Sequence, residues 1–252
     1  MGMFSFGSAR VHYVEEGDGE LVVLLPGNTA GAAAFTAQLP VFGARYRTVA
    51  LDFLGTGRSE RRTPWPDDWW GDAARQVEAL MDHLDRDRGM LVGTSGGAVV
   101  ALRAAAAFPD RIGAVVADSF SRRLDEAMLR ANVLDARLQP SEAQRTFWQI
   151  CHGDDWPAVV AADTAVMERL VERGGDWLDV DPGRITAPVL LTGSTADPAI
   201  PDIEADYRGL RARIPRGRVF LTGDGEHPLM WTRPDLFNRQ AMGFLASEAD
   251  HG

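Results

Sequence analysis

One serine of this chain stands in a pattern that can turn a hydroxyl into a nucleophile. Residues Gly93-Thr94-Ser95-Gly96-Gly97 follow a predicted strand over 89–92 and open a predicted helix over 95–108. A strand that turns abruptly into a helix crowds the positions two residues to either side, and glycine fits there. The pattern therefore predicts that Ser95 is held on a strained turn at a helix N-terminus, where its hydroxyl can attack a carbonyl carbon.

A serine hydroxyl is a weak nucleophile without a neighbouring base, and the chain has five histidines. His227 follows the last predicted strand, at the same edge of the sheet as Ser95, and is the expected base. His152 lies in a helical region and is the alternative; it is otherwise interpreted as a solvent-exposed residue without a catalytic role. The remaining histidines lie in an early strand, on a helix and near the C-terminus: His12, His83 and His251.

The base needs a carboxylate that fixes its tautomer and stabilises its charged form. Asp197 lies in the loop after the predicted strand 188–191, and the order Ser95, Asp197, His227 is typical of one large architecture of serine hydrolases. Asp118 ends the preceding predicted strand and is the alternative acid; it is otherwise interpreted as a carboxylate that caps a turn.

Acyl transfer also needs hydrogen-bond donors for the negative charge that develops on the carbonyl oxygen. The backbone N–H of Gly96, directly after Ser95, is one expected donor. The second is expected from the loop Pro26-Gly27-Asn28-Thr29, which follows the apolar run 21–25. Proline has no N–H, so Asn28 is the expected donor, although the same loop also fits a simple turn.

Strand-like and helical segments alternate along the chain, which is typical of a parallel sheet covered by helices. The expected strands are 10–14, 21–25, 47–52, 89–92, 114–117, 188–191 and 218–221, and the expected helices of the same region are 30–42, 67–84, 95–108, 203–214 and 234–245. Between residues 119 and 184 only helical periodicity remains. We therefore predict an α/β core of residues 1–118 and 185–252, with residues 119–184 inserted as a helical cap.

Taken together, these segments resemble the α/β-hydrolase fold family over nearly the whole chain. Within it the chain is most similar to the biphenyl hydrolase-like (valacyclovir hydrolase-like) serine hydrolases, on the Leu24–Gly27 loop, the segment 64–84 and the cap segment 142–177. The resemblance implies an α/β fold with a mostly parallel eight-stranded sheet, flanked by helices and carrying an inserted helical cap. In that branch an acidic residue follows the nucleophile, whereas this chain has Gly96.

The serine nucleophile narrows the expected reaction, because epoxide hydrolases and haloalkane dehalogenases of this fold use an aspartate. We expect a serine hydrolase that cleaves a small carboxylic ester, thioester or lactone. A C–C bond hydrolase or a biosynthetic cyclase with the same triad is an alternative, and so is a ligand receptor that keeps the pocket without turnover. No metal or organic cofactor is expected, since the sequence has no ligand-spaced cluster.

Tryptophans point to the kind of substrate. Three of the seven lie in the predicted cap and three between residues 64 and 70. Aromatic side chains above Ser95 would favour an apolar or aromatic acyl group, although the same residues also suit packing of the cap onto the core.

The single cysteine, Cys151, is expected to be buried and inert.

The composition of the chain limits the kinds of binding partner and the cellular location that we expect. The chain has 252 residues, a formal charge of −10, and no lysine, and this acidic balance argues against nucleic acid and anionic membranes as partners. The first sixteen residues show no basic segment followed by an apolar run, and no apolar run is long enough to span a bilayer. A cytoplasmic protein acting on a small molecule is therefore expected; the sequence does not indicate its oligomeric state.

Overall fold

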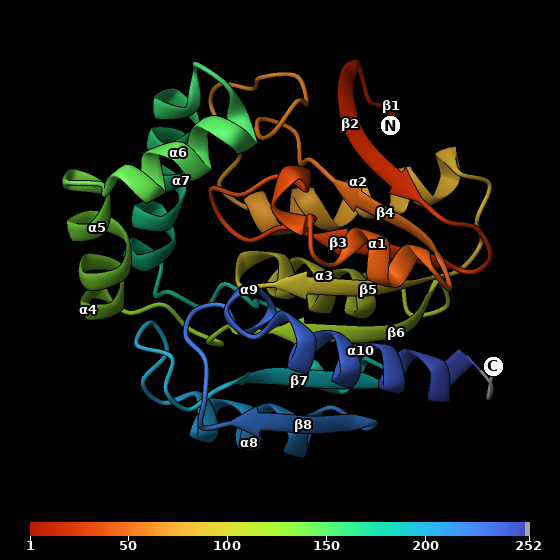
Figure 1. The fold of residues 1–252 in the computed structure, drawn as a ribbon. Coiled ribbons are helices and arrows are strands. Elements are labelled where there is room, and N and C mark those ends of the chain that lie inside the picture. Colours follow the sequence, from red (N-terminus) through yellow and green to blue (C-terminus); the bar gives the residue numbers. More distant parts are fainter. Residues whose placement is uncertain (250–252) are drawn as a thin grey trace.

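The computed structural model describes residues 1–249; His251 lies outside the described residues. A single eight-stranded sheet forms the centre of this part of the chain (Figure 1). Its strands are β1 (Gly2–Phe6), β2 (Ala9–Glu16), β3 (Leu21–Leu25), β4 (Arg47–Leu51), β5 (Gly89–Thr94), β6 (Ile112–Asp118), β7 (Val189–Ser194) and β8 (Gly217–Thr222). They lie in the order β1-β2-β4-β3-β5-β6-β7-β8. Strand β2 pairs antiparallel with both of its neighbours, β1 and β4, and every other pair of neighbouring strands is parallel. The predicted mostly parallel, eight-stranded sheet is therefore confirmed.

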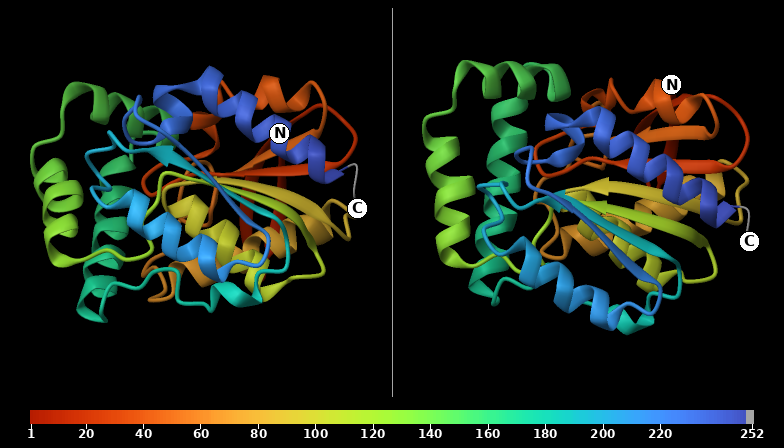
Figure 2. Two further views of the ribbon diagram at one scale, coloured as in Figure 1. Left: turned by 90° about the horizontal axis from the view of Figure 1, so that it is seen from below. Right: turned by 60° about the horizontal axis from the view of Figure 1, so that its bottom comes forward.

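Helices cover both faces of this sheet, as two views along it show (Figure 2). The helices of the sheet region, residues 1–118 and 185–249, are η1 (Ala32–Phe35), α1 (Leu39–Gly43), α2 (Trp69–His83), α3 (Gly96–Ala107), α8 (Ile203–Arg213), α9 (Leu229–Thr232) and α10 (Pro234–Ala249). The short helix η3 (Pro182–Arg184), just before β7, packs against α3 and α8. The central strands are buried on both faces, which explains why β3 is a continuous apolar run. Val22 and Leu24 pack under α1 and α10, whereas Val23 and Leu25 pack under α2 and α3.

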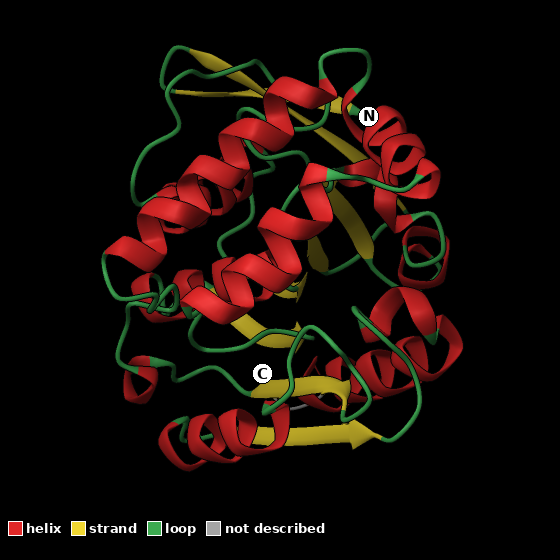
Figure 3. Cartoon of the chain, turned by 90° about the vertical axis from the view of Figure 1, so that its left-hand side faces the viewer, coloured by secondary structure: helices red, strands yellow, loops and turns green. Residues whose placement is uncertain are grey.

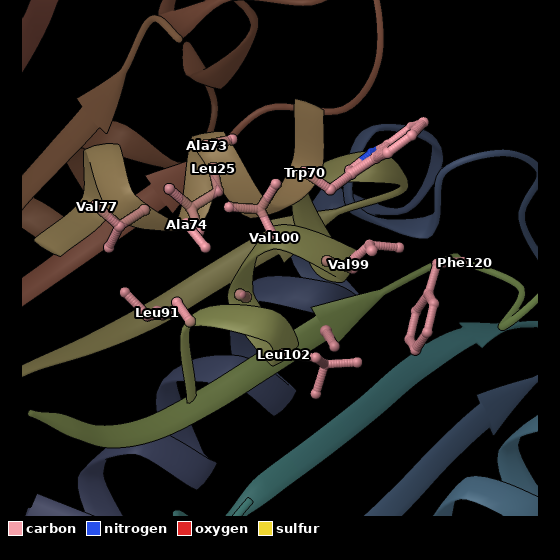
Figure 4. Packing of buried hydrophobic residues seen from close by; sticks show 14 of the residues in the cluster. Leu25, Trp70, Ala73, Ala74, Val77, Leu91, Val99, Val100, Leu102 and Phe120 are labelled. Carbon is pink, nitrogen blue, oxygen red and sulfur yellow. The ribbon is translucent and has the colours of Figure 1, made fainter. Parts of the chain in front are cut away.

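Helix α3 lies against the middle of the sheet and fixes the position of Ser95 at its start. Eleven of its twelve residues are buried, and their small side chains let the helix approach both β5 and α2 closely. Figure 4 shows Val100 of α3 directed toward Ala73 and Ala74 of α2, whereas Val99 and Leu102 of α3 lie on the side of Phe120. Because this layer is packed tightly from several sides, the turn before α3 has a well-defined position.

Between β6 and β7 the chain forms helices that lie beyond the carboxyl ends of the parallel strands (Figures 1 and 3). They are α4 (Glu126–Leu129), the π-helical turn η2 (Arg130–Leu134), α5 (Asp135–Leu138), α6 (Glu142–His152) and α7 (Trp156–Glu172). We refer to residues 119–184 as the inserted segment. Arg61 fastens it to the sheet region, because its guanidinium donates to both carboxylate oxygens of Asp155 and to the carbonyl oxygen of His152.

Two expectations about the elements were wrong. Strand β1, at the sheet edge, was not predicted, and the helix expected over 30–42 is instead the two short helices η1 and α1. Pro40 explains the second error, because its ring and missing N–H prevent a helix from running through it but suit a helix start. Among residues 1–249, no helix is both long and apolar enough to cross a membrane.

Candidate active site

Ser95 occupies the turn between β5 and α3 with a backbone that non-glycine residues rarely adopt, at φ 51° and ψ −123°. The neighbouring glycines are required by contact. A Cβ at Gly93 would overlap the carbonyl oxygen of Gly97, and a Cβ at Gly97 would overlap that of Leu25. The obstacles are backbone atoms of packed elements and cannot swing away. The sequence pattern therefore corresponds to a turn that only this glycine spacing permits.

His227 and Asp197 reach Ser95 from two loops that follow neighbouring strands. The Nδ1 atom of His227 lies 2.8 Å from Oδ2 of Asp197, and Nε2 lies 3.2 Å from Oγ of Ser95. The Asp197 side chain is completely buried, while the imidazole is 29% exposed. With Nδ1–H donating to the carboxylate, Nε2 presents its lone pair to the serine hydroxyl. The structure thus brings together the three residues that the sequence singled out.

Asp118, the alternative acid, points elsewhere. Its carboxylate accepts hydrogen bonds from the hydroxyls of Thr94 (3.0 Å) and Thr192 (2.9 Å) and from the backbone N–H of Met230 (3.1 Å). Complete burial raises the pKa of this carboxyl to about 6. Asp118 therefore links the ends of β5 and β7 to α9, which begins two residues after His227, and it is Asp197 that meets the imidazole.

His152, the alternative base, is buried rather than exposed, so that expectation was wrong. Its Nε2–H donates to the carbonyl oxygen of Thr29 at 3.0 Å, and its Nδ1 accepts the backbone N–H of Gly57 at 2.9 Å. Both ring nitrogens are occupied, which leaves none for Ser95. Burial also lowers the pKa of this imidazole, which keeps it neutral.

The loop that carries Asn28 adjoins the start of α3. A Cβ at Gly96 would overlap Oδ1 of Asn28, so the side chain of Asn28 lies directly against Gly96, and the residues of the two expected oxyanion donors are neighbours. The Nδ2 atom of Asn28 donates to Oδ1 of Asp163 at 2.6 Å, in the inserted segment. Thr29, next in the loop, has a left-handed φ of 57°. The loop is thus held in a strained conformation beside Ser95.

Sequence reasoning missed Asp163, although a signal was present. The buried residues of α7 recur at helical spacing, and Asp163 is the one charged residue among them: Val159, Val160, Asp163, Val166, Met167 and Leu170. A carboxylate on a buried stripe needs a partner, and Arg137 provides one with its Nη2 2.7 Å from Oδ2.

A cavity of about 360 Å³ opens above Ser95 and His227, between the sheet region and the inserted segment. Apolar side chains predominate in its wall, among them Phe120, Leu124, Met128, Phe147, Trp148, Met167, Trp177 and Trp231. The tryptophans of 64–70 do not line it. They pack against one another in the core: the ring of Trp69 stacks on that of Trp65, with centroids 5.5 Å apart, and meets that of Trp70 edge-to-face, with centroids 5.7 Å apart.

The single cysteine of the chain, Cys151, lies near the end of α6. Cys151 is buried, and burial raises the pKa of its thiol to about 11, so a reactive thiolate does not form near neutral pH. Within residues 1–249 no group of three or more His, Cys, Asp or Glu side chains is placed to hold a metal ion.

Comparison with known proteins places this geometry in context. The sequence model described as "alpha/beta hydrolase fold" matches residues 20–152. Serine hydrolase BPHL from Homo sapiens is 27% identical, over 94% of this chain and 83% of that protein. The 2-hydroxy-6-oxo-6-phenylhexa-2,4-dienoate hydrolase of Comamonas testosteroni is 30% identical, over 93% and 91%. Among solved structures, the enol-lactonase from Burkholderia xenovorans LB400 superposes with a TM-score of 0.78 at 20% identity, covering 97% of this chain and all of that one.

Proposed function

Because the chain belongs to the α/β-hydrolase fold family, we propose that it is a serine hydrolase that cleaves a small carboxylic ester, thioester or lactone. The observation that carries the proposal is the line of contacts from Ser95 Oγ through His227 to the buried carboxylate of Asp197, at the floor of an apolar cavity. This is the arrangement that activates a serine hydroxyl for acyl transfer.

The proposed reaction has two half-reactions. Ser95 Oγ attacks the substrate carbonyl carbon while Nε2 of His227 takes the hydroxyl proton, and Asp197 stabilises the imidazolium that forms. The carbonyl oxygen becomes an oxyanion that accepts from the backbone N–H groups of Asn28 and Gly96. Collapse of this intermediate expels the alcohol, thiol or lactone oxygen, which receives the proton from His227. Water then attacks the acyl-enzyme with the same proton transfers and releases the acid.

The apolar and aromatic lining of the cavity supports a substrate with an apolar or aromatic acyl group. Its volume is at the small end of the range for ligand pockets, and its aromatic wall is contributed mainly by the inserted segment, which we propose acts as a cap. The similarity to the 2-hydroxy-6-oxo-6-phenylhexa-2,4-dienoate hydrolase of Comamonas testosteroni, whose substrate carries a phenyl group, supports an aromatic substrate.

A second reaction class uses the same three residues. The dienoate hydrolase of Comamonas testosteroni is 30% identical across nearly the whole chain, and this similarity favours hydrolysis of a C–C bond beside a ketone as the alternative to ester cleavage. A biosynthetic cyclase or a receptor without turnover has no comparable support.

A panel of substrates tests the proposal. We would measure hydrolysis of p-nitrophenyl esters, thioesters and lactones of increasing acyl size, together with a vinylogous 1,5-diketo acid as a C–C substrate, by wild type and Ser95→Ala. The proposal predicts turnover of at least one ester, thioester or lactone by wild type and loss of more than about 10³-fold in the variant. Turnover confined to the C–C substrate would favour the alternative. No turnover of any compound, or full activity in Ser95→Ala, would contradict a serine hydrolase.

A further inference from the structure

We propose that the inserted segment, through Asp163 and His152, holds the loop Gly27–Ala30 in the position that catalysis needs. The inference rests on the proposed function, since it assigns these two side chains as positioning residues for the oxyanion donor at Asn28. It makes the oxyanion site depend on closure of the inserted segment over the cavity.

Asp163 makes the first link, between α7 and the side chain of Asn28. Its carboxylate is 1% exposed, and each oxygen has one partner: Oδ1 accepts from Asn28 Nδ2 at 2.6 Å and Oδ2 from Arg137 at 2.7 Å. A buried carboxylate that loses a partner is strongly destabilised, so this pair of contacts resists any shift of the loop. Asn28 Oδ1 meanwhile rests against Gly96, where no side chain intervenes.

His152 makes the second link, from the end of α6 to the carbonyl oxygen of Thr29. Thr29 has a left-handed backbone, which costs a β-branched residue free energy unless the surroundings hold it there. The imidazole supplies that restraint, and its other nitrogen accepts the N–H of Gly57 in the sheet region. The loop is therefore fastened from two helices of the inserted segment at two successive residues.

The hydrogen bonds from Asp163 to Asn28 and from His152 to Thr29 lie beside the cavity in which the substrate would bind. Asn28, Thr29 and Arg137 all line the cavity, so whatever fills the cavity also contacts the fastened loop. If the inserted segment moved away to admit a substrate, Asn28 and Thr29 would lose both partners. When the inserted segment moved back over the bound substrate, the loop would return to its position beside Ser95. The backbone N–H groups of Asn28 and Gly96 would then be in place to stabilise the oxyanion of the transition state.

Four single variants separate positioning from packing. Asp163→Ala and His152→Leu remove one link each. His152→Gln keeps a donor and an acceptor at a spacing close to that of the ring nitrogens. Glu168→Ala removes an exposed carboxylate from the same helix, α7, and is the matched control. A small displacement of catalytic groups costs up to about 10²-fold in rate, so we expect kcat to fall about 10- to 100-fold in the first two variants. The KM should change less than about 3-fold, and His152→Gln and Glu168→Ala should stay within about 3-fold of wild-type kcat.

A double-mutant cycle shows whether Asp163 acts through Asn28. Asn28→Ala removes the amide side chain but keeps the backbone N–H, and should itself lower kcat. In that background Asp163→Ala should cause no further loss, because the link is already broken. If the two losses simply multiply, Asp163 does not act through Asn28 and the inference is wrong.

Hydrogen exchange provides a readout that does not depend on turnover. Backbone amides of residues 27–32 should exchange at least about 10-fold faster in Asp163→Ala and His152→Leu than in wild type or Glu168→Ala, with unchanged exchange in β5. Unchanged exchange in the loop would overturn the inference, as would faster exchange with unaltered kcat. Failure of the proposed function is distinct, because it would appear as Ser95→Ala retaining wild-type hydrolysis.

Discussion

Two buried aspartates close to His227 lie at the end of β6 and just beyond the end of β7, and their contacts give them different roles. Asp197 lies in a loop after β7, where Oδ1 accepts the backbone N–H of Ala199 at 2.8 Å and Oδ2 faces the imidazole. Asp118 is the last residue of β6 itself, and its oxygens are occupied by two threonine hydroxyls and a backbone N–H. Because Asp197 lies in a loop beyond the strand, its carboxylate can contact and orient the imidazole, whereas the carboxylate of Asp118 holds the ends of β5 and β7 together.

This division predicts unequal kinetic effects. Asp197→Asn should lower kcat by about 10³- to 10⁴-fold, because the amide cannot stabilise the imidazolium. Asp118→Asn should lower kcat by less than about 10-fold, since it weakens only the hydrogen bonds that connect β5, β7 and α9. Steady-state hydrolysis of one ester by both variants decides the point. The opposite order would move the catalytic acid to Asp118.

The raised pKa of Asp118 also predicts how stability depends on pH. Because burial raises this pKa from 3.8 to about 6, the folded protein binds a proton that the unfolded chain has released between those values. Stability from this group is present below about pH 4 and lost as pH rises through about 6. Relative to wild type, Asp118→Asn should therefore gain roughly 3 kcal/mol in unfolding free energy between pH 3.5 and 7.5. Urea denaturation at both pH values measures this, and a pH-independent difference would contradict the assignment.

The strand–turn–helix element β5–α3 can form only because its glycines admit backbone atoms. Gly97 lies against the carbonyl of Leu25 in β3, so three elements meet at a point where no Cβ fits. The turn stores strain at Ser95, and the packed α3 behind it holds that strain in place.

Substitution of that glycine should be costly. Gly97→Ala should lower the unfolding free energy by about 3 kcal/mol or more, because backbone atoms must move. Gly243→Ala, in α10 where nothing lies within 4 Å of an added Cβ, is the matched control and should be neutral or stabilise by about 0.5–1 kcal/mol. Chemical denaturation of both variants provides the comparison, and equal effects would show that the contact at Gly97 is not limiting.

Most elements could be predicted from sequence because their signals are local. The apolar run of β3 and the helical stripe of α2 depend on residues a few positions apart, and both were predicted within two residues. Strand β1 was missed because a five-residue edge strand has only one neighbour to pack against and shows little alternation. The helix expected over 30–42 was wrong because the constraint at Pro40 was overlooked.

The candidate site could be predicted in part, and the limit was again the distance along the sequence between the residues that meet. Ser95, Asp197 and His227 follow strands in a known order, so topology alone brings them to one edge. The links from His152 to Thr29 and from Asp163 to Asn28 span 123 and 135 residues, and no local pattern specifies the pairing. The boundaries of the cap and the roles of Asn28 and Gly96 as oxyanion donors stay predictions.

On the scale of the whole molecule, the cavity is made by two parts of the chain that meet above the sheet. The sheet region supplies Ser95 and His227, and the inserted segment supplies most of the apolar wall. Phe147 of α6 packs against Trp231 of α9, with ring centroids 5.4 Å apart, so an aromatic pair joins the two parts in the wall of the cavity. Acyl-group size should therefore be set largely by this contact.

Opening that contact should change specificity. Phe147→Ala should shift the preferred acyl chain to one longer by several carbons and lower kcat/KM for short esters, because the wall that held them is lost. Leu138→Ala, also in the inserted segment but 77% exposed and outside the cavity wall, should leave the profile unchanged. Rates for a series of p-nitrophenyl esters measure both. An unchanged profile in Phe147→Ala would show that the acyl group binds elsewhere.

The central claim is that Ser95 carries the acyl group during turnover, and mass spectrometry of the enzyme quenched in acid tests it most directly. During hydrolysis of a p-nitrophenyl ester, wild type should gain the mass of one acyl group, located on the peptide that contains Ser95. His227→Ala and Ser95→Ala should gain none at the same time point. Turnover by wild type with no acyl group on Ser95, or with the group on another residue, would contradict the account.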